Sequence, residues 1–192
     1  MPDMDFGFFG VNAGVLADPA TMVEAATTAE AAGWESIWTG EHVVVSSPQR
    51  PPSPVRPDTH FVDQVATLAH LSAHTTTLRL GTGIVILPQR NPVVLAKELA
   101  SIDVLSGGRL EAGFGVGYVP AEFDAVGVPF AQRGARMDDH IDALRAMWRG
   151  DLEFEGRFTS WHGVEAHPRP VGPDGPPIHV GGGSSATFRR VV

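Results

Sequence analysis

The sequence predicts an α/β fold of the (β/α)8 TIM-barrel type, in an incomplete form with about five βα units. Three observations support this prediction. Short apolar segments alternate along the chain with segments of helical periodicity. Glycines follow most of the apolar segments at their carboxyl ends. A closed barrel of eight units needs roughly 250 residues, whereas this chain has 192, so we expect the N-terminal part of a full barrel.

The clearest unit lies in residues 78–117 and has the pattern strand, helix, strand. Residues 78–87 are almost uninterrupted apolar residues, as in a strand that is covered on both faces. Pro92 suits the first turn of the helix that follows, and residues 109–114 form the next strand. Two such strands must be parallel and joined by a right-handed crossover. In parallel sheets of this kind, ligands bind at the carboxyl ends of the strands.

Two units precede this stretch. Residues 5–9 form a short strand, and Asp18 with Pro19 begins a helix through an N-cap and a first-turn proline. Gly33 ends that helix, and residues 34–38 form the second strand. The order again is strand, helix, strand, as the barrel type requires.

The pattern then changes. Residues 43–59 contain five prolines and show neither helical nor strand periodicity, which predicts a long surface loop that is mobile or acts as a lid. A helix over residues 63–73 leads back to the central unit. Beyond that unit we expect helices, a hairpin in an irregular segment and a fifth strand, in the order 118–126, 132–148, 154–161 (the hairpin, within 151–177) and 178–180.

Composition excludes several classes of function. The formal net charge of −8 argues against a nucleic-acid partner. The absence of cysteine excludes disulfides and thiolate catalysis. We expect no membrane partner, since the longest apolar runs fall short of ~18 residues, and no signal peptide, so a cytoplasmic location is expected. No spacing of ligand residues suggests a metal. A short parallel sheet leaves exposed edges, which predicts a homo-oligomer, a dimer in the simplest case.

A family resemblance supports the same fold. The chain contains the stretch LPQRNPVVLAKELASIDVLSGGRLEAGFGVGYVPAEFDAVGV, which resembles the central signature of the luciferase-like monooxygenase superfamily. It is most similar to the branch that uses the deazaflavin coenzyme F420. Further matches, in family order, are GFFG, AEAAGWESIWTGEHV, RGARMDDHIDALRAMW and PPIHVGGGSS. The resemblance implies that residues 1–192 form a single TIM-barrel domain with a flavin-type cofactor at the strand ends.

The resemblance assigns roles to residues at three strand ends. Glu41 and His42 match an acidic–His pair that faces the deazaflavin ring, where the histidine donates a proton or orients the ring. Gly83 and Ile84 match a non-prolyl cis peptide that forms a bulge behind the central ring. Tyr118 matches a position beside the ring where some F420-dependent dehydrogenases carry Glu, so a strong second acid is not expected there.

The end of the fifth strand is where we expect the cofactor phosphate to bind. Three glycines match those whose backbone amides approach the cofactor phosphate, and Ser184 begins the following helix, whose N-terminus favours an anion. The alternative is a plain connecting loop. The glycines concerned are Gly181, Gly182 and Gly183.

Several candidate residues have more than one possible role. An imidazole titrates near neutrality and suits proton transfer at a reacting ring, so His42 is the expected catalytic group. Glu41 either holds the tautomer of a nearby imidazole, bonds the cofactor or is a simple carboxylate at the rim. Arg90 and Arg133 reach an acidic cofactor tail or form surface ion pairs. Ordinary structural or surface roles are expected for His60, His70, His74, His140, His162, His167 and His179.

The function expected from these residues is hydride transfer between a small organic substrate and coenzyme F420. One alternative is an FMN-dependent monooxygenase that uses reduced flavin and oxygen. Another is a truncated flavin-binding protein without turnover. The substrate is not predictable, because variable loops determine it in this fold.

Overall fold

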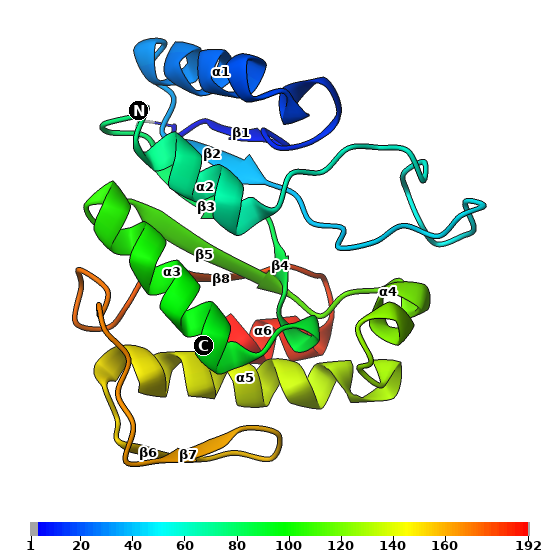
Figure 1. The fold of residues 1–192 in the computed structure, drawn as a ribbon, viewed down its shortest axis with the longest axis vertical. Helices are drawn as coiled ribbons and strands as arrows, with labels where there is room; N and C mark the ends of the chain where they lie inside the picture. Colours follow the sequence, from blue (N-terminus) through cyan, green and yellow to red (C-terminus); the bar gives the residue numbers. More distant parts are fainter. Residues whose placement is uncertain (1–3, 192) are drawn as a thin grey trace.

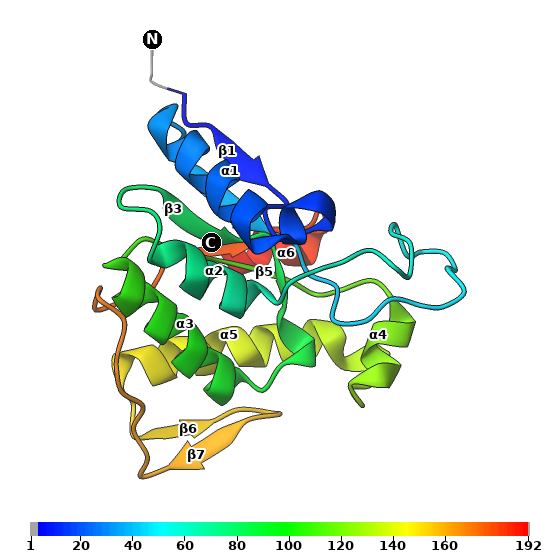
Figure 2. The same ribbon diagram turned by 45° about the horizontal axis from the view of Figure 1, so that its top comes forward.

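The structure, a computed structural model, describes residues 4–191. Its main sheet is parallel and curved, with helices along its outer face (Figures 1 and 2). The strands follow one another in the order β1, β2, β3 and β5; β4 continues beside β5 where β3 ends, and β8 pairs with the other side of β5. The strands are β1 (Gly7–Phe9), β2 (Ser36–Thr39), β3 (Arg79–Thr82), β4 (Val85–Ile86), β5 (Leu110–Gly115) and β8 (Ile178–Val180). This arrangement is an incomplete (β/α)8 barrel, as predicted.

The helices alternate with these strands. Between β1 and β5 lie α1 (Pro19–Ala31), α2 (Gln64–Ser72) and α3 (Pro92–Ser106); after β5 come α4 (Pro120–Ala125), α5 (Arg133–Arg149) and α6 (Ser185–Val191). Three short 3-10 helices are η1 (Gly14–Ala17), η2 (Leu87–Gln89) and η3 (Phe130–Gln132). A separate antiparallel hairpin, β6 (Glu153–Glu155) and β7 (Ser160–His162), lies below α5 in Figure 1, where a hairpin was predicted.

Local side-chain chemistry fixes the helix starts. Asp18 accepts a hydrogen bond from the Thr21 backbone N–H at 2.9 Å and caps α1. Asn91 accepts from the first N–H groups of α3 in the same way, and Pro92 occupies the first turn. At the other end of α3, Gly107 adopts the left-handed conformation, φ 70°, that closes many helices. These boundaries agree with the prediction to within a few residues.

The strand expected over residues 78–87 is wrong in one respect, because it is interrupted. Gly81 of β3 pairs with Glu111, and Val85 of β4 pairs with Phe114. The chain therefore advances four positions, from 81 to 85, while β5 advances only three, from 111 to 114. The extra residue produces a bulge at Gly83–Ile84. Apolar continuity could not reveal this interruption, since residues on both sides of it are buried.

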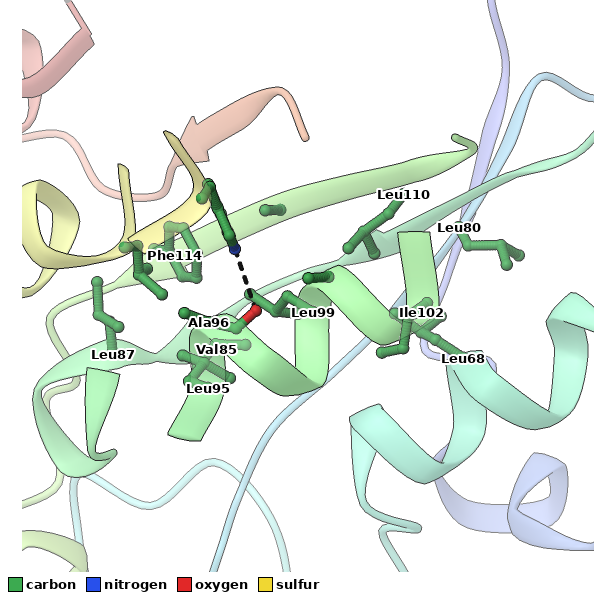
Figure 3. Packing of buried hydrophobic residues seen from close by; sticks show 14 of the residues in the cluster. Leu68, Leu80, Val85, Leu87, Leu95, Ala96, Leu99, Ile102, Leu110 and Phe114 are labelled. Atoms are coloured by element: carbon green, nitrogen blue, oxygen red, sulfur yellow. Dashed lines mark hydrogen bonds between the residues drawn. The ribbon is translucent and has the colours of Figure 1, made fainter. Parts of the chain in front are cut away.

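The hydrophobic core lies between the sheet and α2, α3 and α5 (Figure 3). Leu80 and Phe114 from the strands pack against Leu68 of α2 and Leu99 of α3, all with no measurable exposure. Trp148 of α5 is also buried in this cluster, and its indole N–H donates to the Ala96 carbonyl oxygen at 3.1 Å (Figure 3). The outer helices are therefore held to the sheet by one continuous apolar layer.

Residues 43–59 form the expected long loop, which contains no helix or strand and extends beyond the carboxyl end of β2 (Figures 1 and 2). None of the helices in residues 4–191 has the length and apolar character that crossing a membrane requires. The same residues contain no cluster of three or more His, Asp or Glu side chains that could hold a metal ion. Association through the sheet edges stays a prediction.

Candidate active site

A cavity of about 610 Å3 opens at the carboxyl ends of the parallel strands; we call it the strand-end cavity. The turns after β2, β3, β5 and β8 all contribute to its wall. His42, Ile84 and Gly182 therefore meet at one site although they are far apart in the sequence. The other predicted site residues on its wall are Glu41, Gly83, Tyr118 and Gly181, whereas Gly183 and Ser184 do not line it.

His42 is the central polar group of this cavity. Its Nδ1 lies 2.7 Å from Oε1 of Glu122, and both side chains are largely buried. Because a carboxylate only accepts hydrogen bonds, Nδ1 carries the hydrogen in this pair. In the neutral imidazole, Nε2 then holds the lone pair and is the nitrogen left for proton exchange.

Glu122 was not predicted as a site residue. It lies in the first turn of α4, its side chain is only 1% exposed, and its Oε2 has no hydrogen-bond partner among residues 4–191. A carboxylate is favourable near a helix N-terminus, which was the only local signal of its importance. Its contact with a residue 80 positions earlier in the chain has no signature in a single sequence.

Glu41 does not hold the imidazole, as one of its predicted roles required. Its carboxylate accepts from the Ile86 backbone N–H and pairs with the guanidinium of Arg90. Arg90 also contacts Asp63 at 3.2 Å and is only 20% exposed, so this is a half-buried network and not a surface ion pair. Glu41 thus joins the end of β2 to the backbone of β4.

A second residue missed by the sequence analysis is Asn12. It is 0% exposed, and its amide donates to the carbonyl oxygens of Gly40 at 2.9 Å and Val62 at 2.7 Å. Its Oδ1 accepts from the Gly40 N–H at 2.8 Å. Asn12 therefore fixes the segment that carries Glu41 and His42 to the turn after β1.

Aromatic groups surround the imidazole. The ring of Phe61 lies 5.4 Å from that of His42, and the ring of Tyr118 lies 6.5 Å from it, both edge to face. Tyr118 is 53% exposed; partial burial and the nearby charge of Glu122 raise the pKa of its hydroxyl. Tyr118 is thus a neutral rim residue at physiological pH.

The predicted cis peptide between Gly83 and Ile84 is confirmed. The Ile84 side chain packs against glycines of neighbouring strands: a Cβ atom added at Gly115 would stand 2.6 Å from Ile84 Cδ1, and one at Gly181 would stand 3.3 Å from Cγ2. At Gly113 an added Cβ would lie 2.0 Å from the Thr82 carbonyl oxygen. The glycines of β5 therefore permit close approach of neighbouring groups, and Gly115 leaves room for Ile84 at the floor of the cavity.

The glycine turn after β8 agrees only in part with its predicted role. The Gly181 N–H donates to the Phe114 carbonyl oxygen at 2.8 Å and continues the sheet, so it is not free to bind a phosphate. Ser184 accepts a hydrogen bond from the Thr187 N–H at 3.3 Å and starts α6. A phosphate contact by Gly182 and Gly183 stays a prediction.

Two other histidines have structural partners, as expected. His140 is buried beside the Leu87 carbonyl oxygen at 3.2 Å, and burial lowers the pKa of its imidazole. His179 contacts Glu111 at 2.6 Å across β8 and β5. Neither residue lines the strand-end cavity.

The curved parallel sheet defines an incomplete βα barrel, and the cavity at its strand ends lies where ligands bind in that class. The family model for luciferase-like monooxygenases matches residues 4–192. The chain belongs to this family.

Several known proteins are similar to this chain. The oxygenase component of a flavin-dependent trigonelline monooxygenase from Acinetobacter baylyi is 32% identical over 161 residues, covering 83% of this chain and 42% of that protein. The crystal structure of the monooxygenase RslO1 from Streptomyces bottropensis superposes with a TM-score of 0.75 at 30% identity, covering 92% of this chain and 53% of RslO1.

A third structure, an F420-dependent secondary alcohol dehydrogenase in complex with an F420–acetone adduct, has a TM-score of 0.75 at 19% identity and covers 94% of this chain and 52% of that one. At this identity the likeness shows the fold alone. The chain spans 42% of the length of the trigonelline monooxygenase component and 64% of that of an uncharacterised protein from Mycobacterium bovis, to which it is 33% identical.

Proposed function

We propose that the strand-end cavity binds the flat ring of a flavin-type cofactor, and that the chain is the ring-binding part of an oxidoreductase. The main support is the meeting of His42, Ile84 and Gly182 in one cavity of about 610 Å3. That volume lies within the 300–1,000 Å3 range of cofactor and ligand sites. The glycine floor around Ile84 leaves space that a side chain would otherwise fill, as a planar ring requires.

The polar groups suit this ligand as well. A mostly apolar wall with one well-held polar group is typical of cofactor sites. Glu122 does not line the cavity, but its carboxylate holds the imidazole of His42 through Nδ1. The residues of the strand-end cavity therefore fit a flavin-type cofactor.

When bound, the cofactor would supply the redox chemistry. The protein contributes orientation and proton handling. Ile84 supports one face of the ring position, and Glu122 keeps the His42 hydrogen on Nδ1, so that Nε2 can accept a proton. If Nε2 is protonated, the Glu122 carboxylate stabilises the imidazolium that forms. Pro54 and Val55 of the 43–59 loop line the cavity and would limit water access to the reacting atoms.

The first candidate reaction is monooxygenation with reduced FMN. Two relatives at 30% identity or more are monooxygenases by name, and one of them is flavin-dependent. This choice reverses the order expected from the sequence, where coenzyme F420 came first.

The second candidate is hydride transfer with coenzyme F420. It is supported by the resemblance of the His42 segment to F420-dependent enzymes. The geometry also suits it, because interconversion of an alcohol and a ketone needs a group such as Nε2 of His42 to exchange the substrate proton.

Titration of the purified chain with FMN and, separately, with coenzyme F420 tests the proposal. We expect binding of one cofactor, detected by a change in its fluorescence, at micromolar concentration. His42→Ala should alter the bound spectrum and abolish turnover, whereas His74→Ala, an exposed histidine outside the cavity, should do neither. FMN binding without F420 binding selects the first candidate, and the opposite result selects the second.

Binding without turnover would favour the third alternative, a flavin-binding protein that is not a catalyst. If neither cofactor binds while circular dichroism shows a folded chain, the proposal is wrong.

A further inference from the structure

A second cavity, of about 400 Å3, lies beside the strand-end cavity; we call it the side cavity. The two cavities share Gly40, Glu41, His42 and Phe61 on their walls. The side cavity extends from these residues toward the first turns of α2 and α3. The proposed cofactor function gives it no role.

Buried amide groups on its wall carry atoms without a protein partner; Oε1 of Gln64 accepts from the Thr39 hydroxyl at 3.1 Å, but other amide atoms are unpaired among residues 4–191. Gln64 is 1% exposed, and its Nε2 makes no hydrogen bond to any of residues 4–191. Neither Oε1 nor Nε2 of Gln89 has a partner in the same part of the chain, although both atoms are shielded from solvent. Buried polar side chains are normally hydrogen-bonded, so these amides indicate a partner from outside the polypeptide.

The wall also carries an excess of negative charge. Three carboxylates, Glu41, Asp63 and Glu98, line the cavity with one guanidinium, that of Arg90. Arg90 is already bonded to Glu41 and Asp63. The Glu98 carboxylate forms no ion pair or hydrogen bond within the described residues. Its partial burial raises the pKa of this carboxyl group; the charge of Arg90 opposes this shift, and that of Asp63 adds to it.

The rest of the wall is apolar. Phe61, Val94 and Leu95 line the same space. An aromatic ring close to carboxylates is a typical binding site for an organic cation, because the face of the ring and the carboxylate charge both attract it. A hydrated metal ion would suit these side chains poorly, and the described residues hold no cluster of three metal-ligating groups.

We propose that the side cavity binds a small organic ammonium ion. The ammonium group would pair with the Glu98 carboxylate and donate to Oε1 of Gln89, while the carbon part of the ligand contacts Phe61 and Val94. Nε2 of Gln64 would donate to an oxygen of the ligand or to a bridging water. Because His42 lines both cavities, a ligand bound here lies next to the proposed reaction site.

The test compares three probes of similar size and different charge: benzylammonium, benzyl alcohol and benzoate. Each is titrated into the isotope-labelled chain without any cofactor, at neutral pH and low salt, and amide and methyl shifts are followed by NMR. We expect millimolar binding of benzylammonium, about tenfold weaker binding of benzyl alcohol, since one partly screened ion pair separates the two, and no binding of benzoate. Intermolecular contacts should connect the probe to the methyl groups of Val94 and Leu95.

The Glu98→Gln variant removes the unpaired charge and keeps the shape of the side chain. It should weaken benzylammonium binding about tenfold, to the level of benzyl alcohol. Glu24→Gln makes the same change of net charge on the exposed surface of α1 and should leave the affinity unchanged.

Equal binding of benzoate, an unchanged affinity in Glu98→Gln, or contacts that map to another part of the molecule would each overturn the proposal. The contact map decides the question even if the variant fails to fold. Because no cofactor is present in this experiment, its outcome is independent of the proposed flavin function.

Discussion

Replacement of Asn12 by alanine tests how the site segment is held in place. The fully buried side chain of Asn12 makes three hydrogen bonds of 2.7–2.9 Å, two with Gly40 and one with Val62. A net contribution of about 1 kcal/mol for each bond gives about 3 kcal/mol. The alanine variant also leaves the Gly40 N–H and two carbonyl oxygens without their partners, which raises the expected loss to about 3–5 kcal/mol.

This loss is a large part of the 5–15 kcal/mol that stabilises a typical domain. Equilibrium unfolding in urea measures it directly, provided that the slope of the transition is unchanged. Asn91→Ala is the matched control: that asparagine caps α3 through two hydrogen bonds at the exposed surface, and its loss should cost about 1 kcal/mol.

The two variants should also differ in hydrogen exchange. Asn12→Ala should accelerate exchange of the Gly40 amide, because its acceptor is lost, while Asn91→Ala should not affect it. If Asn12→Ala costs no more stability than Asn91→Ala, Asn12 is not the anchor of the segment that carries His42.

Three other perturbations test separate parts of the structure. Gly113→Ala should cost at least about 2 kcal/mol in urea unfolding, since the new Cβ would lie 2.0 Å from the Thr82 carbonyl oxygen and overpacking of a core costs roughly that much; a loss below 1 kcal/mol would contradict the close approach. Burial would raise the pKa of Glu30, but backbone N–H donors of the loop before β3 outweigh it and hold that pKa at about 2, below its ordinary 4.5. Stability that is present above pH 4.5 should therefore fall by about 1–2 kcal/mol, allowing for solvent screening, as the pH is lowered to about 2, and Glu30→Gln should remove this dependence. Glu122→Leu should move the hydrogen of the neutral His42 ring from Nδ1 to Nε2, which the ring 15N shifts at high pH report. Glu122→Gln keeps an acceptor and should preserve the tautomer. Identical spectra for the wild type and both variants would rule out the assigned pair.

Most of the fold could be predicted because its signals are local. The α1 cap at Asp18, the first-turn proline of α3 at Pro92 and the hairpin near residues 154–161 all depend on neighbours within a few positions. The bulge at residues 83–84 was not visible in the apolar pattern of its strand, and only the family resemblance indicated it. Periodicity shows which face of an element is buried, but it does not show which side chain lies opposite.

The pair of His42 and Glu122 in the candidate site shows the same limit, because local pattern does not show which side chains meet. One of the three roles expected for Glu41 was to hold the tautomer of a nearby imidazole, but Glu41 and His42 have different partners. His42, on the wall of the strand-end cavity, points toward Glu122, whereas Glu41 points toward Arg90 and β4. The acid that holds the imidazole is thus distant in the sequence, where no local pattern indicates it. Glu41→Gln should therefore leave the His42 tautomer unchanged, and a shift equal to that of Glu122→Leu would show that the two acids act on the imidazole together.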